Sequence, residues 1–184
     1  MTPRNANSPA AVSAVTRIVS GGQTGVDRAA LDSGLAAGIP VGGWCPRGRR
    51  SEAGLIPTHY PLQETAARNY TVRTAWNVRD SDGTLVIVLD EISSGTRLTL
   101  DVASEQGKPF KVVHLRPVDS PGLFTTENSL SDQIESVVDW LRVRKIHVLN
   151  VAGPRGSSHE DIYSEALEFM RLLLKQILNQ DASR

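Results

Sequence analysis

The stretch RIVSGGQTGVDRAAL, residues 17–31, decides the interpretation of the whole chain. Residues 17–20 are predicted to form a short strand, and residues 26–37 a helix with small and apolar side chains on one stripe. The glycines between them permit positive φ angles and a close approach of the backbone to a ligand. The turn would therefore present the unpaired N–H groups of a helix start, which favour anions and phosphate above all.

This stretch matches neither common nucleotide-binding motif. No Gly-Lys-Ser/Thr follows the glycines, so it is not a Walker loop. The usual dinucleotide fingerprint needs an acid about 20 residues further on, but that region reads GGWCPR at residues 42–47. Arg47 and Arg49 would suit a phosphate there. Two plainer interpretations stay open: the glycines form only a tight turn, and the charged loop 45–58 only faces water.

Composition indicates one globular domain. The chain has 184 residues, 40% hydrophobic and 22% charged, with a formal net charge of zero, so no overall basic field favours nucleic acid. The single cysteine, Cys45, excludes an internal disulfide and is consistent with a reducing cytoplasm. No apolar run is long enough to span a membrane. We interpret residues 1–15 as a flexible leader and residues 16–180 as one ligand-binding domain.

Strand and helix patterns alternate along the rest of the chain. Strands are predicted at residues 39–44, 84–89, 110–115 and 145–151, and helices at 70–79, 96–106 and 159–179. A further helix, capped by Ser129 or Ser131, is predicted from the apolar spacing of Ile134, Val137, Val138 and Leu141. The continuous apolar runs at 84–89 and 110–115 are typical of strands buried on both faces of a parallel sheet. We therefore expect an α/β fold, a single doubly wound parallel sheet with helices on both faces.

In such a sheet, ligands bind beyond the carboxyl ends of the strands. Four turns of small residues should meet at that edge, at residues 21–25, 42–47, 93–96 and 150–158. The last helix carries a second apolar stripe that would be exposed to solvent in a monomer; it consists of Leu167, Met170, Leu174 and Leu178. We expect it to form a subunit interface of a homo-oligomer, or else to be covered by the rest of the chain.

A series of motifs resembles the family of molybdenum cofactor carrier proteins, which belongs to the Rossmann-like SLOG and lysine-decarboxylase-like superfamily. The resemblance covers roughly residues 17–174. The motifs, in order, are SGGQTGVD (20–27), GWCP (43–46) with the following RGR, YPL (60–62), NV with DSDGT (77–84), SGT (94–96), GKP (107–109) and NVAGPR (150–155).

The resemblance implies binding of molybdenum cofactor, a phosphorylated pterin whose dithiolene holds the metal, and an oligomer, dimer or tetramer. It also allows a comparison with the related phosphoribohydrolases, whose signature PGGxGTxxE ends in a catalytic glutamate. Gly95 and Thr96 match that signature, and Arg73 resembles an upstream arginine of those enzymes. The glutamate position falls on Thr99, so a carrier is favoured over an enzyme.

From these observations we predict one ligand site and no catalytic residue. The site set is Gly21, Gly22, Gln23, Thr24, Gly25, Asp27, Trp44, Arg47, Arg49, Arg73, Ser94, Gly95 and Thr96. The glycine-rich turn and residues 94–96 would bind anions, and the arginines would balance charge. Asp27 would accept from the pterin, or only favour its helix start; Trp44 would stack on a ring, or only pack.

Three points stay open. Cys45 would either meet the metal as a thiolate or lie buried as a small hydrophobe. The partner would be a molybdoenzyme or a protein of cofactor synthesis. The alternatives to a carrier are a phosphoribohydrolase-like enzyme that processes nucleotides, in which Asp27, Asp90 or Glu91 replaces the glutamate, and a sensor of NAD or ADP-ribose.

Overall fold

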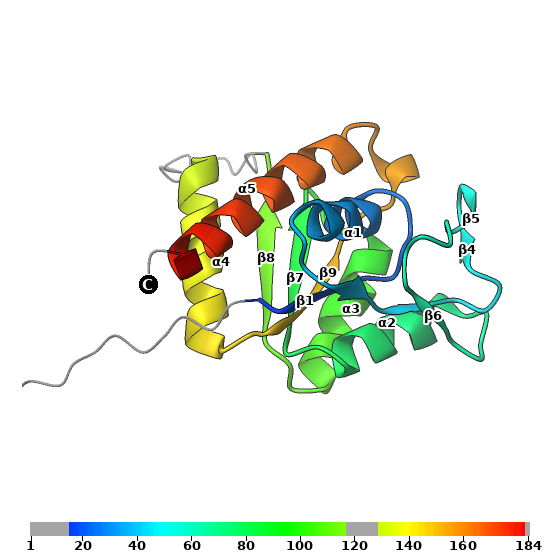
Figure 1. The fold of residues 1–184 in the computed structure, drawn as a ribbon. Helices are drawn as coiled ribbons and strands as arrows, with labels where there is room; N and C mark the ends of the chain where they lie inside the picture. Colours follow the sequence, from blue (N-terminus) through cyan, green and yellow to red (C-terminus); the bar gives the residue numbers. More distant parts are fainter. Residues whose placement is uncertain (1–14, 117–128, 183–184) are drawn as a thin grey trace, which may run out of the picture.

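The computed structural model describes residues 15–116 and 129–182. Its centre is a five-stranded sheet in the order β2-β1-β9-β7-β8, in which all paired strands run parallel (Figure 1). The strands are β1 (Arg17–Val19), β2 (Val41–Gly42), β7 (Gly83–Val88), β8 (Phe110–His114) and β9 (Val148–Ala152). The last strand in the sequence therefore lies in the middle of the sheet.

Helices cover both faces of this sheet. One layer consists of α1 (Val26–Ala36), α4 (Leu130–Arg144) and α5 (Ile162–Ala182), and the other of α2 (Tyr70–Arg79) and α3 (Ser94–Glu105) (Figure 1). The alternation of strand and helix patterns predicted this α/β architecture, and the structure confirms it.

Strand β7 explains why the apolar run in the sequence is continuous. All six of its residues are buried. Leu85 and Ile87 belong to the core cluster beneath α1, α4 and α5, whereas Val86 and Val88 pack with Leu100 of α3. Because successive side chains point to opposite faces, a strand between two helix layers must be apolar at every position.

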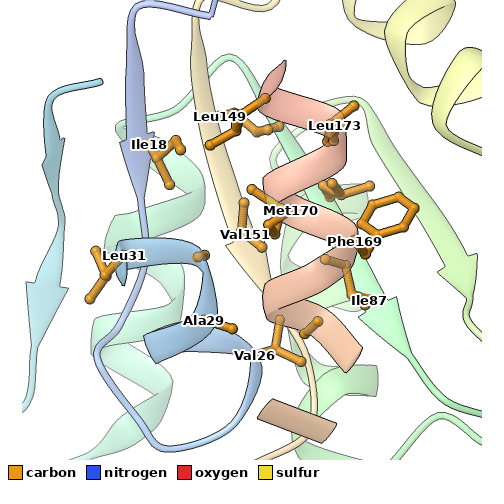
Figure 2. Packing of buried hydrophobic residues seen from close by; sticks show 14 of the residues in the cluster. Ile18, Val26, Ala29, Leu31, Ile87, Leu149, Val151, Phe169, Met170 and Leu173 are labelled. Carbon is orange, nitrogen blue, oxygen red and sulfur yellow. The ribbon is translucent and has the colours of Figure 1, made fainter. Parts of the chain in front are cut away.

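Helix α5 holds one layer together. Phe169, Met170 and Leu173 are almost fully buried, and Figure 2 shows Met170 near Val151 and Phe169 near Ile87 of the sheet. The second stripe of α5 is only partly exposed to solvent, because Met170 and Leu174 are buried within the chain. Leu167 and Leu178 are the residues of this stripe that remain accessible to a second subunit.

The structure corrects three element predictions. The strand predicted at residues 39–44 is interrupted at Gly43, whose φ of 127° is open only to glycine. The chain continues as β3 (Trp44–Cys45), which pairs with β6 (Gln63–Glu64) in a separate small sheet. The segment 110–115 forms the edge strand β8, with Phe110 exposed, and is not buried on both faces.

The last helix begins later than predicted. Residues Gly156–Ser158 form a short 3₁₀ turn, η1, and α5 starts at Ile162 instead of His159. Residues 1–14 of the predicted leader lie outside the described part of the chain. Within residues 15–116 and 129–182, no helix has the length and apolarity that a membrane crossing requires.

The packing of α5 makes a direct stability prediction. Replacing Phe169, which is 1% exposed, by alanine leaves a cavity between α5 and the sheet and should lower the free energy of unfolding by about 3–5 kcal/mol. Val143→Ala on α4, at a side chain 70% exposed, is the control and should change it by less than about 0.5 kcal/mol. Urea denaturation followed by circular dichroism measures both; equal effects would contradict the assignment of Phe169 to the core.

Candidate functional site

A cleft of about 320 Å³ lies beyond the carboxyl ends of β1, β9 and β7. After β9 the chain continues to α5 on one face of the sheet, and after β7 to α3 on the other. Neighbouring strands whose connections part in this way leave a crevice between them. The lining residues are Gln23, Asp27, Tyr70, Arg73, Thr74, Ser93, Ser94, Gly95, Thr96, Leu98, Thr99, Ala152, Gly153, Arg155 and Ser158.

The start of α3 forms one wall of the cleft. Ser93 caps the helix and its Oγ accepts from the backbone N–H of Thr96 at 3.3 Å. The preceding two amides, those of Ser94 and Gly95, have no acceptor among the described residues. A Cβ at Gly95 would meet nothing within 4 Å, so open space lies beside this amide. Two free N–H groups at the positive end of a helix dipole suit an anion.

A buried ion pair forms the floor. Asp27 of α1 is 4% exposed, and its Oδ2 lies 3.2 Å from Nη1 of Arg73 on α2. The backbone N–H of Gln23 donates to the same oxygen. Burial raises the pKa of Asp27, and the nearby charge of Arg73 opposes that rise without cancelling it.

Gly21 is what allows this pair to form. A Cβ at position 21 would lie 2.0 Å from Nη1 of Arg73, so any other residue would displace the guanidinium. The Nε of Arg73 is buried and has no partner among the described residues. An unpaired buried donor costs free energy, so the guanidinium is held at the floor at some cost to stability.

The loop after β9 closes the third side. Arg155 and Ser158 line the cleft, and the Arg155 side chain is 61% exposed. The Nε of Arg155 lies 3.3 Å from Oε2 of Glu52, which stands on the hairpin formed by β4 (Arg50–Ser51) and β5 (Gly54–Leu55). The cleft thus has one cation at its floor and a second at its rim.

Thr99, at the position of the catalytic glutamate of the phosphoribohydrolases, does line the cleft. It is 5% exposed, and its hydroxyl lies 3.4 Å from the backbone oxygen of Gly95. A hydroxyl cannot replace the carboxyl of that glutamate as a general acid or base. Asp27 is the acidic side chain that lines the cleft among the described residues.

Six predicted site residues line the cleft: Gln23, Asp27, Arg73, Ser94, Gly95 and Thr96. Gly21 supports it from behind. The rest of the glycine-rich turn faces protein instead: Gly22 lies against Leu62, and Gly25 against the backbone of Pro154. The hydroxyl of Thr24 contacts Glu52, so the turn itself is not the open anion cradle that the sequence predicted.

The other predicted residues have different contacts. Trp44 packs edge-on against Trp76, and its Nε1 donates to Asp80 at 2.7 Å. Arg47 is exposed and does not line the cleft. The guanidinium of Arg49 donates to four backbone oxygens of the loop 56–62, those of Ile56, Pro57, Tyr60 and Leu62. These bonds use its donors, so Arg49 is not free to bind a ligand, contrary to the prediction.

Cys45 lies in the core and does not line the cleft. Cys45 is fully buried in the main core cluster, and burial raises the pKa of its thiol. It therefore cannot meet a ligand in the cleft as a thiolate. Across the described ranges, no three His, Cys, Asp or Glu side chains gather in a way that could hold a metal ion.

Sequence reasoning missed several lining residues, above all Tyr70, Arg155 and Ser158. The guanidinium carbon of Arg73 lies 5.8 Å from the ring centre of Tyr70, so the two side chains form one wall. The signal for Arg155 was present, since it lies in the small-residue turn at 150–158. Its use in the site was not readable, because local sequence does not say which side chain of a loop turns inward.

The Asp27 environment gives a prediction with a definite sign. A raised pKa in the folded state means that ionised Asp27 costs stability. The free energy of unfolding of the wild type relative to Asp27→Asn should therefore fall as the pH rises from below the ordinary value of 3.8 through the folded pKa. Loss of the partner of Arg73 adds an offset that does not depend on pH.

Asp80→Asn is the matched control, with the opposite sign. A hydrogen bond from Arg79 lowers the pKa of Asp80, so the wild-type advantage over this variant is present above 3.8 and is lost as the pH falls. Thermal unfolding between pH 3 and pH 8 measures both differences. The same slope for the two variants would contradict the buried, charge-disfavouring site of Asp27.

Comparisons with known proteins agree with the fold. The model of the circularly permutated YpsA SLOG family matches residues 18–174. The chain is also 39% identical to a protein of Syntrophus aciditrophicus SB, whose crystal structure is described as that of a "putative molybdenum carrier protein"; the match covers 88% of this chain and 96% of that chain, with a TM-score of 0.80. Among curated proteins, no relative matches. The chain therefore belongs to the circularly permutated YpsA SLOG family.

Proposed function

We propose that this protein binds and carries molybdenum cofactor, protecting it and delivering it to a recipient, without catalysing a reaction. The observation that carries the proposal is the pairing, in one cleft, of two free amides at the start of α3 with the buried Asp27–Arg73 pair. The 39% identical protein described as a "putative molybdenum carrier protein" supports the choice of ligand.

The phosphate end of the ligand fits the start of α3. Ser94 and Gly95 offer backbone N–H groups, and the hydroxyl of Ser94 lies on the same wall. Phosphate oxygens can accept hydrogen bonds from these neutral N–H groups, so no charged side chain has to lose its solvation at this wall. Arg155 lies at the rim, where its charge is paired with that of Glu52.

The pterin end fits the floor. The carboxyl of Asp27 accepts hydrogen bonds from the amino-pyrimidine edge, while the guanidinium of Arg73 donates to a ring oxygen or nitrogen. Tyr70 offers a ring face beside them. A cleft of about 320 Å³ lies at the small end of the range for ligand sites, so the ligand would extend over the open rim.

The metal would be held by the ligand itself. The described residues offer no metal-binding cluster, and Cys45 is sealed in the core. Molybdenum would therefore remain on the dithiolene sulfurs of the pterin, with the protein shielding it from solvent. Release to a recipient enzyme then requires no exchange of protein ligands at the metal.

Further parts of the proposal concern where and with whom the protein acts. We propose a cytoplasmic carrier that meets a molybdoenzyme or a protein of cofactor synthesis, and that assembles as a homo-oligomer. The half-exposed remainder of the α5 stripe, Leu167 and Leu178, supports the oligomer.

The second candidate is a phosphoribohydrolase-like enzyme that cuts an N-glycosidic bond of a nucleotide. One observation favours it: burial raises the pKa of Asp27, and a carboxyl that keeps its proton more easily is suited to general acid catalysis. Against it stands Thr99 in place of the glutamate, which leaves Asp27 as a single acid paired to an arginine.

Ser94→Pro tests the anion wall by removing one N–H group. Proline is well tolerated at the first position of a helix, and the extended backbone of Ser93, with ψ of 162°, suits the residue before a proline. The variant should fold normally and bind molybdenum cofactor roughly 10-fold to 100-fold more weakly, since it loses a hydrogen bond to a charged group.

Ser94→Ala is the control, because it removes the hydroxyl and keeps the N–H. It should bind at most a few times more weakly than the wild type. Fluorescence titration with the isolated cofactor under argon measures the affinities. Unchanged affinity of Ser94→Pro would remove α3 from the binding site.

Delivery is tested by transfer. Wild type loaded with cofactor should restore activity to a cofactor-free molybdoenzyme and slow the oxidation of the cofactor in air. Ser94→Pro should do both less well at equal concentration. A wild type that binds the cofactor but neither shields nor transfers it would reduce the function to binding.

Nucleotide hydrolysis gives the opposite test. The carrier hypothesis predicts that the wild type releases no base from nucleoside monophosphates beyond the rate of the Asp27→Asn variant, as followed by chromatography. Release that turns over and disappears in Asp27→Asn would favour the enzyme.

A further inference from the structure

The β4–β5 hairpin places a carboxylate against the rim of the cleft. In Figure 1 this hairpin stands apart from the main sheet, beyond α1. Glu52 at its tip reaches the loop after β9: the N–H of Ser157 donates to its Oε1 at 2.9 Å, and the hydroxyl of Ser157 donates to Oε2 at 2.5 Å. The hydroxyl of Thr24 also contacts Oε1.

The same carboxylate neutralises the rim cation. Its Oε2 lies 3.3 Å from Nε of Arg155, and no other ion pair of Arg155 is present in the described part of the chain. The backbone N–H of Glu52 donates to Oε1 of Gln23 at 3.0 Å, which brings the hairpin to a residue that lines the cleft. Burial alone would raise the pKa of Glu52, but the hydrogen bonds from Ser157 and Thr24 and the charge of Arg155 outweigh it and lower the pKa.

Charge around the cleft balances only because of this contact. Asp27 and Arg73 cancel at the floor, and Glu52 and Arg155 cancel at the rim. A ligand with a single phosphate bound at α3 leaves the rim pair intact. A ligand with a second anionic group that reaches Arg155 competes with Glu52 there, because two anions beside one guanidinium and one hydroxyl repel each other.

We propose that Glu52 is a built-in competitor for Arg155 and Ser157, and that ligands with two linked anionic groups bind by displacing it and releasing the hairpin. This inference rests on the proposed function, since it assumes that the cleft takes an anion at α3. It adds a specificity-determining residue on a segment that does not itself line the cleft.

Pyrophosphate is the probe, because it is the simplest ligand with two linked anionic groups. By isothermal titration calorimetry at fixed ionic strength, Glu52→Gln should bind it about fivefold to tenfold more tightly than the wild type, since the competing charge is gone. Glu64→Gln is the matched control: Glu64 accepts from the N–H of Gly48 on the neighbouring loop and does not line the cleft, so the affinity should change less than about twofold.

A double-mutant cycle isolates the contact. In an Arg155→Ala background, Glu52→Gln should gain less than about twofold, because the group for which Glu52 competes has been removed. An equal gain with and without Arg155 would overturn the competition. So would an affinity of Glu52→Gln that equals or falls below that of the wild type, since Glu52 would then support the site.

Hydrogen exchange of the wild type supplies a readout that needs no variant. Saturating pyrophosphate should speed amide exchange in residues 50–55 and at Ser157, and leave the β3–β6 pair unchanged. Unchanged or slower exchange of the hairpin overturns the displacement.

The two proposals fail differently. If the wild type binds pyrophosphate in a manner sensitive to Ser94→Pro, but Glu52→Gln is not tighter, only the competition falls. If neither the wild type nor Glu52→Gln binds pyrophosphate, the anion wall at α3 falls as well, and with it the basis of the carrier proposal.

Discussion

The structure depends on β9 lying between β1 and β7. Its side chains Leu149 and Val151 are fully buried, and it pairs with both neighbours in parallel register. This arrangement brings the carboxyl ends of three strands together and sends the following segments to opposite faces. The cleft, the helix start at α3 and the buried pair on α1 and α2 all follow from it.

The contacts inside the cleft favour the proposed carrier over a hydrolase. The carboxylate of Asp27 forms an ion pair with Arg73. The absence of a side chain at Gly21 leaves room for the guanidinium of Arg73. A hydrolase needs a carboxyl free to exchange protons at the scissile bond. A carrier needs fixed donors and acceptors that are already in place, because preorganised groups cost little entropy when the ligand binds.

The sequence predicted the layers well, because a strand between two helix layers must be apolar throughout, as residues 84–89 are. It predicted the start of α3 and the Asp27 stretch for similarly local reasons. It could not predict that the chain would turn at Gly43 and take Trp44 away from the cleft. Nor could it predict that Arg49 would donate its hydrogen bonds to backbone oxygens. Both depend on how the loop 45–62 folds back. Arg155 was missed because its position relative to the cleft depends on contacts with Glu52, about a hundred residues away in the sequence.

The late position of β9 in the chain has a consequence for synthesis. The hydroxyl of Ser20 donates to the backbone oxygen of Val151, a pairing across 131 residues. Domains emerge from the ribosome in sequence order, and contacts between distant segments form slowly. A nascent chain that ends before β9 has a sheet divided in two and no complete cleft. Binding of a ligand in the cleft must therefore await the synthesis of β9 and of the loop that follows it.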